Sequence, residues 1–231
     1  FFRDLSSLNW IFLDTFKIYV GPVNILLNCF VMFILTRREI RTTYNTVFFL
    51  MALDQTIVIG TMTIDMHKTM LYECTPWYYS YFWAYFEIIS QCLSQVCRAH
   101  ATWLAVIIAL MRLMSIRSHG TSELKAHLVW LSCGSALLFV TIVNTPNYLG
   151  KVIIFTPFDE QCLETYRPVE RVREMKRVWS HISHSNCKVF RLSCFLTGTL
   201  HNALPCVLLV FLSVTLLNFL RKVLRIMSTK I

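Results

Sequence analysis

The chain has 231 residues, of which 55% are hydrophobic and only 15% are charged, and its mean hydropathy is +0.53. Soluble domains carry roughly 25% charged residues, so this composition excludes an ordinary soluble domain and predicts a polytopic membrane protein. The formal net charge is +9, which in a soluble protein would suggest nucleic-acid binding. Here the basic residues form short clusters beside apolar segments, as topology signals do, and we expect no nucleic-acid partner.

Five apolar segments follow one another along the chain, each close to or above the roughly 20 residues that cross a bilayer core. Residues 150–191 separate the fourth segment from the fifth; they are rich in charge and include YRPVERVREMKRVW, a stretch with a helical pattern. The sequence therefore predicts an all-α, polytopic transmembrane helix bundle that forms one domain over residues 1–231. We expect its helices at about 18–40, 44–70, 80–116, 127–149 and 192–227.

The distribution of basic residues predicts how the bundle lies in the membrane. Most Lys and Arg of the short connections fall in residues 37–43, in residues 113–127 and in the C-terminal tail, which five spans place on one side. By the positive-inside rule this side is cytoplasmic and the N-terminus is extracellular. The segment 150–191 is also basic, but it is long and contains several acids, so it carries less weight.

The third apolar segment contains one polar stripe on an otherwise apolar helix. Polar residues recur there at spacings of three or four, which places them on one face. They are Glu87, Gln91, Ser94 and Arg98. An ionisable side chain inside a membrane faces the bundle interior or water, because exposure to lipid is costly. We therefore expect the other helices to surround this stripe, and a deep Arg98 to pair with Asp54 or with a carboxylate of a ligand.

Three stretches resemble the rhodopsin-like G-protein-coupled receptors in the order that this family shows. ILTRREIRTTYNTVFFLMALD resembles the first inner loop and second helix, ATWLAVIIALMRLMSIR the inner half of the third helix, and LHNALPCVLLVFLSVTLLNFLRKVLR the fifth helix with its proline. The chain is most similar to nematode serpentine receptors of the Srw class, which are themselves similar to FMRFamide-type and myosuppressin-type neuropeptide receptors. The resemblance covers five of seven helices, so we expect either a fragment or a truncated product that cannot signal.

The resemblance implies roles for three polar residues. Arg112 corresponds to the arginine that ends the third helix and contacts a heterotrimeric G protein, although Met111 and Leu113 replace its usual acidic and tyrosine neighbours; the alternative is an arginine that reaches the membrane edge. Asp54 corresponds to a buried aspartate that binds a sodium ion in many such receptors, and Asn28 to an asparagine that hydrogen-bonds near it. A purely structural polar cluster between two helices remains open, and no other cofactor is expected.

The family binds extracellular peptides or small molecules, which gives the polar residues near the outer end a further interpretation. Asp65 and Glu87 could form an acidic entrance for a cationic ligand, with Gln91 and Arg98 deeper in the cavity, or they could be solvated acids at helix ends. His201 and Asn202 precede the proline of the fifth helix and could line the same cavity, although a hydrogen-bonded core histidine is more common.

The family also joins the top of its third helix to the second outer loop by a disulfide, and the resemblance makes Cys74 and Cys162 the candidate pair here. His181, His184 and Cys187 suggest a metal site superficially, but zinc sites normally supply four ligands, so we predict no metal site. No enzyme motif is present, so no catalytic residue is expected. The runner-up function is a transporter or channel-like membrane protein in which intramembrane charges line a substrate path.

Overall fold

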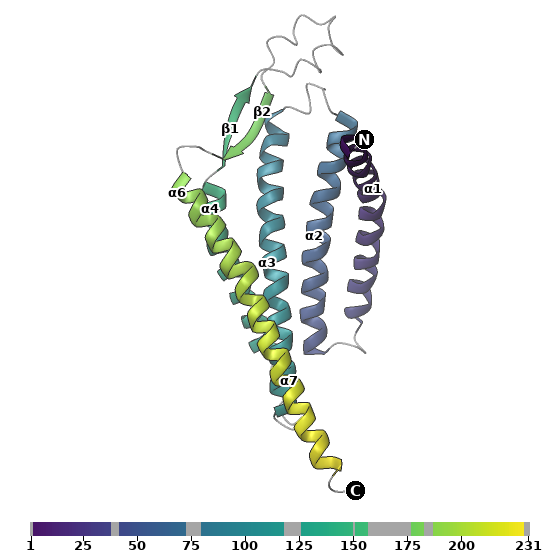
Figure 1. Ribbon diagram of the computed structural model, residues 1–231, viewed down its shortest axis with the longest axis vertical. Helices are drawn as coiled ribbons and strands as arrows, with labels where there is room; N and C mark the ends of the chain where they lie inside the picture. Colours follow the sequence, from purple (N-terminus) through teal and green to yellow (C-terminus); the bar gives the residue numbers. More distant parts are fainter. Residues whose placement is uncertain are drawn as a thin grey trace, which may run out of the picture.

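The computed structural model describes residues 2–37, 42–72, 80–117, 126–149, 151–156, 177–182 and 187–228. Long helices dominate these residues, and one antiparallel hairpin lies beyond the end of the bundle (Figure 1). The helices are α1 (Phe2–Leu35), α2 (Thr43–Tyr72), α3 (Tyr81–Arg117), α4 (Ala126–Leu149), α6 (Cys187–Leu196), the π-helix η4 (Thr197–Ala203) and α7 (Leu204–Ser228). Thus the fifth predicted helix is one continuous rod of three parts.

Helix α3 lies at the centre of the described bundle. It contacts α2, α4, η4 and α7 as well as the second strand of the hairpin, whereas α1 packs on α2. Consecutive long helices run in opposite directions, so the start of α1 and the hairpin lie at one end and the end of α7 at the other (Figure 1). We call these the hairpin end and the C-terminal end. Of the polar stripe predicted on α3, Ser94 is buried and Glu87 is half-buried, but Gln91 and Arg98 are exposed, so the described elements surround only part of it.

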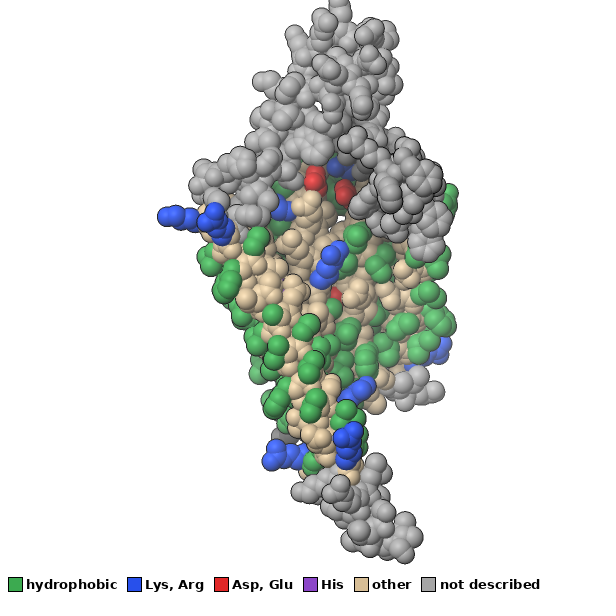
Figure 2. All heavy atoms as spheres, viewed as in Figure 1, with side chains coloured by type: hydrophobic (Ala, Val, Ile, Leu, Met, Phe, Trp, Pro, Cys, Tyr) green, Lys and Arg blue, Asp and Glu red, His purple; other side chains and the backbone are tan. Residues whose placement is uncertain are grey.

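The outward faces of the helices are apolar, as a lipid-facing surface must be. Four helical segments are long and apolar enough to cross a membrane: Thr43–Lys68, Tyr81–Arg117, Ala126–Leu149 and Arg191–Arg221. The apolar part of α1, Tyr19–Leu35, is shorter. Large apolar side chains such as Phe30, Leu138 and Phe211 are exposed in the chain, and hydrophobic side chains cover much of the visible surface (Figure 2). The predicted all-α, multi-pass membrane fold is confirmed.

The packed core nearest the C-terminal end joins α2, α3 and α4. It consists of Val47, Leu104, Ile108, Met111, Val129 and Cys133. Three of its members come from α3 at spacings of four and three, the spacing that brings side chains onto one helix face. Met111 is 3% exposed, so the methionine that replaces the usual acid next to Arg112 serves as a core residue. This apolar contact fixes the end of α3 against its neighbours.

The two strands correct one prediction from the sequence. Strands β1 (Lys151–Thr156) and β2 (Arg177–Ile182) pair antiparallel, with Lys151 opposite Ile182 and Thr156 opposite Arg177. The helical pattern assigned to YRPVERVREMKRVW is therefore wrong for its last three residues, 177–179, which lie in β2; residues 166–176 lie outside the described part. Strand β1 is rich in valine, isoleucine and phenylalanine, which favour strands, and pairing with it overrides the weak helical periodicity of its partner.

Candidate functional site

A chain of hydrogen bonds connects α3 with the hairpin. The Nε2 of Gln91 donates to the Oε1 of Glu87 at 3.0 Å, and the Nζ of Lys151 donates to the Oε1 of Gln91 at 2.5 Å. Glu87 is half-buried, whereas Gln91 is exposed. Both predicted ligand-binding residues thus lie on one face of α3 at the hairpin end, and the first residue of β1 reaches over them. A lysine in this place was not expected from the sequence.

The end of α2 contributes charges of both signs to the same region. Asp65 is half-buried. Lys68, one turn later, is only 6% exposed, and its Nζ lies 5.5 Å from the ring centroid of Trp83 on α3. Figure 2 shows acidic and basic side chains together beneath the grey segment at this end. The hairpin end, where an acidic entrance was predicted, therefore has the two lysines Lys68 and Lys151 beside its acids.

Arg98 lies elsewhere than predicted. It is exposed in the described chain, and its Nη2 donates to the Sδ of Met62 on α2 at 3.2 Å. The pairing with Asp54 is wrong, because Asp54 pairs with His100. Successive helical residues are about 100° apart, so two positions along α3 turn the direction of the side chain by about 200°, away from the side of Arg98. Ser94, one turn earlier, does lie inside: its Oγ is 2.7 Å from the Oγ1 of Thr61.

A buried polar cluster joins α2, α3 and α4 midway along the bundle. The Nδ1 of His100 lies 2.7 Å from the Oδ2 of Asp54, and its Nε2 lies 3.2 Å from the carbonyl oxygen of Cys133. Asp54 is 7% exposed and His100 4%. Cys97, about one turn before the histidine on α3, is also buried. The sequence predicts the buried Asp54 but not the role of His100, the residue that connects the three helices.

The π-helix η4 has a local cause. Pro205 has no backbone N–H, so the carbonyl of His201, four residues earlier, cannot accept the usual helical hydrogen bond. The Oγ1 of Thr102 on α3 donates to this carbonyl at 3.4 Å. The His201 side chain is 2% exposed, and its Nε2 has no hydrogen-bond partner among the described residues. His201 is therefore buried but not the hydrogen-bonded core histidine of the alternative interpretation, and the neighbouring Asn202 is exposed and bonds weakly to Thr197. Their role in ligand binding stays a prediction.

A second polar cluster, absent from the sequence predictions, fixes the start of the fifth span to α4. The Nδ2 of Asn147 donates to the Oδ1 of Asn144 at 3.1 Å and to the Oγ1 of Thr197 at 3.4 Å. Ser193 donates to the Oδ1 of Asn147. Asn144 and Ser193 are almost completely buried. The signal for this cluster was present as two asparagines three residues apart at the end of an otherwise apolar segment.

The C-terminal end of α3 presents the predicted arginine. Arg112 is exposed, while Met111 beside it is buried. The hydroxyl of Tyr44, at the start of α2, donates to the carbonyl oxygen of Met111 at 3.3 Å. This bond fixes the backbone from which Arg112 projects. Among the described residues, nothing covers the Arg112 guanidinium, so a partner can reach it at the C-terminal end of α3.

The predicted contact of Asn28 with Asp54 is not seen, and the predicted disulfide lies outside the described residues. Asn28 is half-buried on α1, but the hydrogen bond of the Asp54 carboxylate is to His100 on α3. Cys74 and Cys162 lie outside the described residues, so their disulfide stays a prediction. Within the described part, six cysteines are free: Cys29, Cys92, Cys97, Cys133, Cys194 and Cys206.

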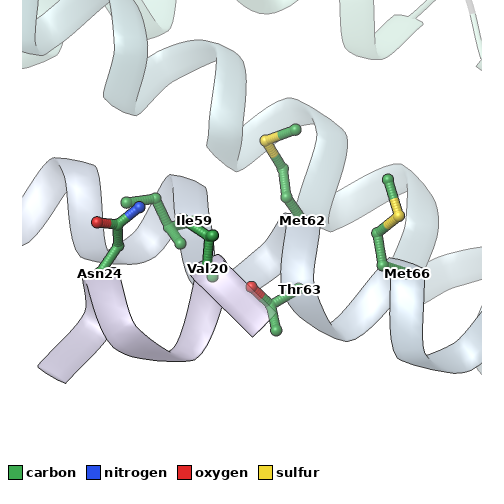
Figure 3. A pocket seen from close by; sticks show the side chains of 7 residues that line it. Val20, Asn24, Ile59, Met62, Thr63 and Met66 are labelled. Atoms are coloured by element: carbon green, nitrogen blue, oxygen red, sulfur yellow. The ribbon is translucent and has the colours of Figure 1, made fainter. Parts of the chain in front are cut away.

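A cavity of about 190 Å³ lies between α1 and α2. Its wall is mostly apolar, and Figure 3 shows Met62 and Met66 of α2 beside it together with Asn24 of α1. The sulfur of Met62 also accepts the hydrogen bond from Arg98, so the cavity and the α3 stripe share one side chain. The cavity does not enclose any of the residues predicted to bind a ligand.

Gly21 lines this cavity, and the close contact of α1 with α2 at this position requires a glycine. A Cβ added at Gly21 would overlap the Oγ1 of Thr63 on α2, whereas one added at Gly60 meets nothing within 4 Å. We expect Gly21→Ala to lower the free energy of unfolding by about 1–3 kcal/mol, because overpacking displaces the two helices. Gly60→Ala, the matched control, should stabilise α2 slightly, by up to about 1 kcal/mol. Equilibrium unfolding in mixed detergent micelles measures both, and equal effects would contradict the close helix contact.

Comparison with known proteins supports the resemblance seen in the sequence. Residues 15–229 match the family model described as serpentine type 7TM GPCR chemoreceptor Srw. The chain is also similar to the G-protein coupled receptor dmsr-1 of Caenorhabditis elegans, with 29% identity over 238 residues that cover 95% of this chain and 46% of that receptor. The chain thus spans about half the length of this relative. Members of this family are receptors and not enzymes, and the match covers nearly the whole chain with its five apolar helices. The chain therefore belongs to the Srw family of serpentine seven-transmembrane G-protein-coupled chemoreceptors.

Proposed function

We propose that this chain is part of a plasma-membrane receptor that binds an extracellular ligand, either a neuropeptide or a chemosensory cue, and activates a heterotrimeric G protein. The observation that carries the proposal is the family match over residues 15–229. It favours a receptor over a transporter or channel.

The ligand site that we propose lies along α3 from the hairpin end to Arg98. Glu87, Gln91 and Arg98 share one helix face, and the exposed Arg98 lies far from either end of a helix that is apolar enough to span the membrane. A guanidinium in contact with lipid is costly, so this face needs cover from protein, water or a bound ligand. The hydrogen bond from Arg98 goes to a thioether, a weak acceptor, which leaves its remaining donors for a ligand carboxylate or carbonyl.

The proposed orientation puts the hairpin end outside the cell. The basic connections 37–43 and 113–127 flank the opposite end of the bundle, which the positive-inside rule assigns to the cytoplasm. The N-terminus of α1 is then extracellular, and the exposed Arg112 faces the cytoplasm, where a G protein would approach. In this orientation Arg112 can donate to the C-terminal carbonyls of an inserted helix.

A reporter assay of the full-length receptor against a library of peptides and chemosensory compounds tests the proposed function. Activation by at least one ligand in cells with the receptor, and not in cells without it, is the expected result. A full-length form that reaches the cell surface and leaves nucleotide exchange unchanged across the library and in the absence of ligand would count against it.

The acidic residues at the hairpin end allow a sharper test once an agonist is known. We expect Asp65→Asn and Glu87→Gln together to weaken a cationic agonist by about 2–5 kcal/mol, the cost of losing one partner of a desolvated charge pair. Concentration–response curves of the double variant measure the change, and Ser135→Ala on the exposed face of α4 is the control. Unchanged potency would contradict the proposed acidic entrance, but it would not contradict the proposed receptor function.

A further inference from the structure

The imidazole of His100 lies beside Asp54, the residue that resembles the sodium-binding aspartate of the wider receptor family. The ring bridges three helices: Nδ1 is 2.7 Å from the Oδ2 of Asp54 on α2, and Nε2 is 3.2 Å from the carbonyl oxygen of Cys133 on α4. Both side chains are more than nine-tenths buried. The contact is therefore part of the packed interior and not a surface pair.

These two contacts determine where the protons lie. A carbonyl oxygen can only accept, so the Nε2 of His100 must carry a hydrogen for its bond to Cys133. The Nδ1 then faces the carboxylate at 2.7 Å, and two lone pairs at that distance would repel each other. One proton must lie between Oδ2 and Nδ1, whether it belongs to an imidazolium or to a carboxylic acid. In both cases the negative charge of Asp54 is compensated by His100.

The side chains around Asp54 do not suit a sodium ion. A hard cation prefers several oxygen ligands, but the described side chain that hydrogen-bonds to this carboxylate is the imidazole of His100. One carboxylate oxygen is already engaged by a proton, and a cation beside it would meet the positive edge of an N–H group. The described residues also contain no cluster of three acidic, histidine or cysteine side chains that could hold a metal ion.

We propose that His100 replaces the sodium ion of the wider family, so that this bundle is held at its centre by a histidine–aspartate bridge and its stability does not respond to sodium. The bridge is part of the chain and cannot diffuse away, unlike an ion. It connects α2, α3 and α4 whatever the sodium concentration on either side of the membrane.

Thermal unfolding of the purified full-length receptor tests this proposal without a ligand, so the result does not depend on the proposed function. The unfolding temperature is measured in sodium chloride and in choline chloride at equal ionic strength. For the unchanged protein we expect the same unfolding temperature in both salts. A specific increase in sodium would overturn the proposal, and this comparison needs no variant to fold.

The variant His100→Ser supplies the positive test. It removes the bridge, frees the Asp54 carboxylate and adds a hydroxyl oxygen, so we expect a sodium-specific rise in unfolding temperature that the unchanged protein lacks. The double variant Asp54→Asn with His100→Ser should lose that rise, because the carboxylate is gone. A folded His100→Ser protein that ignores sodium would show that His100 is not what excludes the ion, and would equally overturn the proposal.

Discussion

His100→Ala is expected to lower the free energy of unfolding by about 3–5 kcal/mol, the cost of leaving a buried charge without its partner. The 7% exposed Asp54 would lose its hydrogen bond to His100, and α2, α3 and α4 would lose their shared bridge. Asp54→Ala should cost less, about 1–3 kcal/mol, because a neutral imidazole can keep its bond to Cys133 and leaves one nitrogen unsatisfied. Equilibrium unfolding in mixed detergent micelles measures both values.

Two comparisons make this prediction specific. His127→Ala, at an exposed position on α4, should change stability by no more than about 0.5 kcal/mol. The double variant Asp54→Leu with His100→Leu should lose less than the sum of the single alanine variants, because both polar groups are removed together. If His100→Ala and His127→Ala cost the same, the bridge does not stabilise the bundle.

Arg112→Ala is expected to reduce agonist-stimulated nucleotide exchange by more than about tenfold, a change that corresponds to about 1.4 kcal/mol. Arg112 is exposed at the end of α3 whose backbone is fixed by Tyr44, so its loss removes donors for the G protein without disturbing the core. Stability and agonist binding should stay near those of the unchanged receptor. The measurement uses reconstituted full-length receptor with the agonist from the library screen.

Arg117→Ala is the matched control for Arg112. Both arginines are exposed near the same end of α3, but only Arg112 follows the buried Met111 that is fixed by Tyr44. Exchange with Arg117→Ala should stay within about twofold of the unchanged receptor, because a solvated rim charge contributes little. Equal losses in both variants would indicate a general electrostatic attraction of the G protein and not a specific role of Arg112.

Much of the polar interior was visible in the sequence, but the partners were not. The α3 stripe and the buried Asp54 stand out because charge is rare in apolar segments. Yet Arg98 and His100 are only two residues apart, and charge alone favours Arg98 as the partner of Asp54. The choice depends on how α3 is rotated against α2, and the rotation is set by packing of the apolar faces, including Leu104 and Ile108.

The sequence alone determined that the chain is a bundle of membrane-crossing helices, because long uncharged segments and basic connections have few other solutions in lipid. It also indicated the receptor family through three ordered stretches. The tertiary structure decided the rest: that β2 is a strand, that His100 bridges three helices, that Asn147 joins α4 to the fifth span, and that Pro205 accompanies a π-helix whose carbonyl Thr102 satisfies. These features depend on contacts between residues far apart in the chain, and such contacts follow from how the helices pack, which local propensity and hydropathy do not determine.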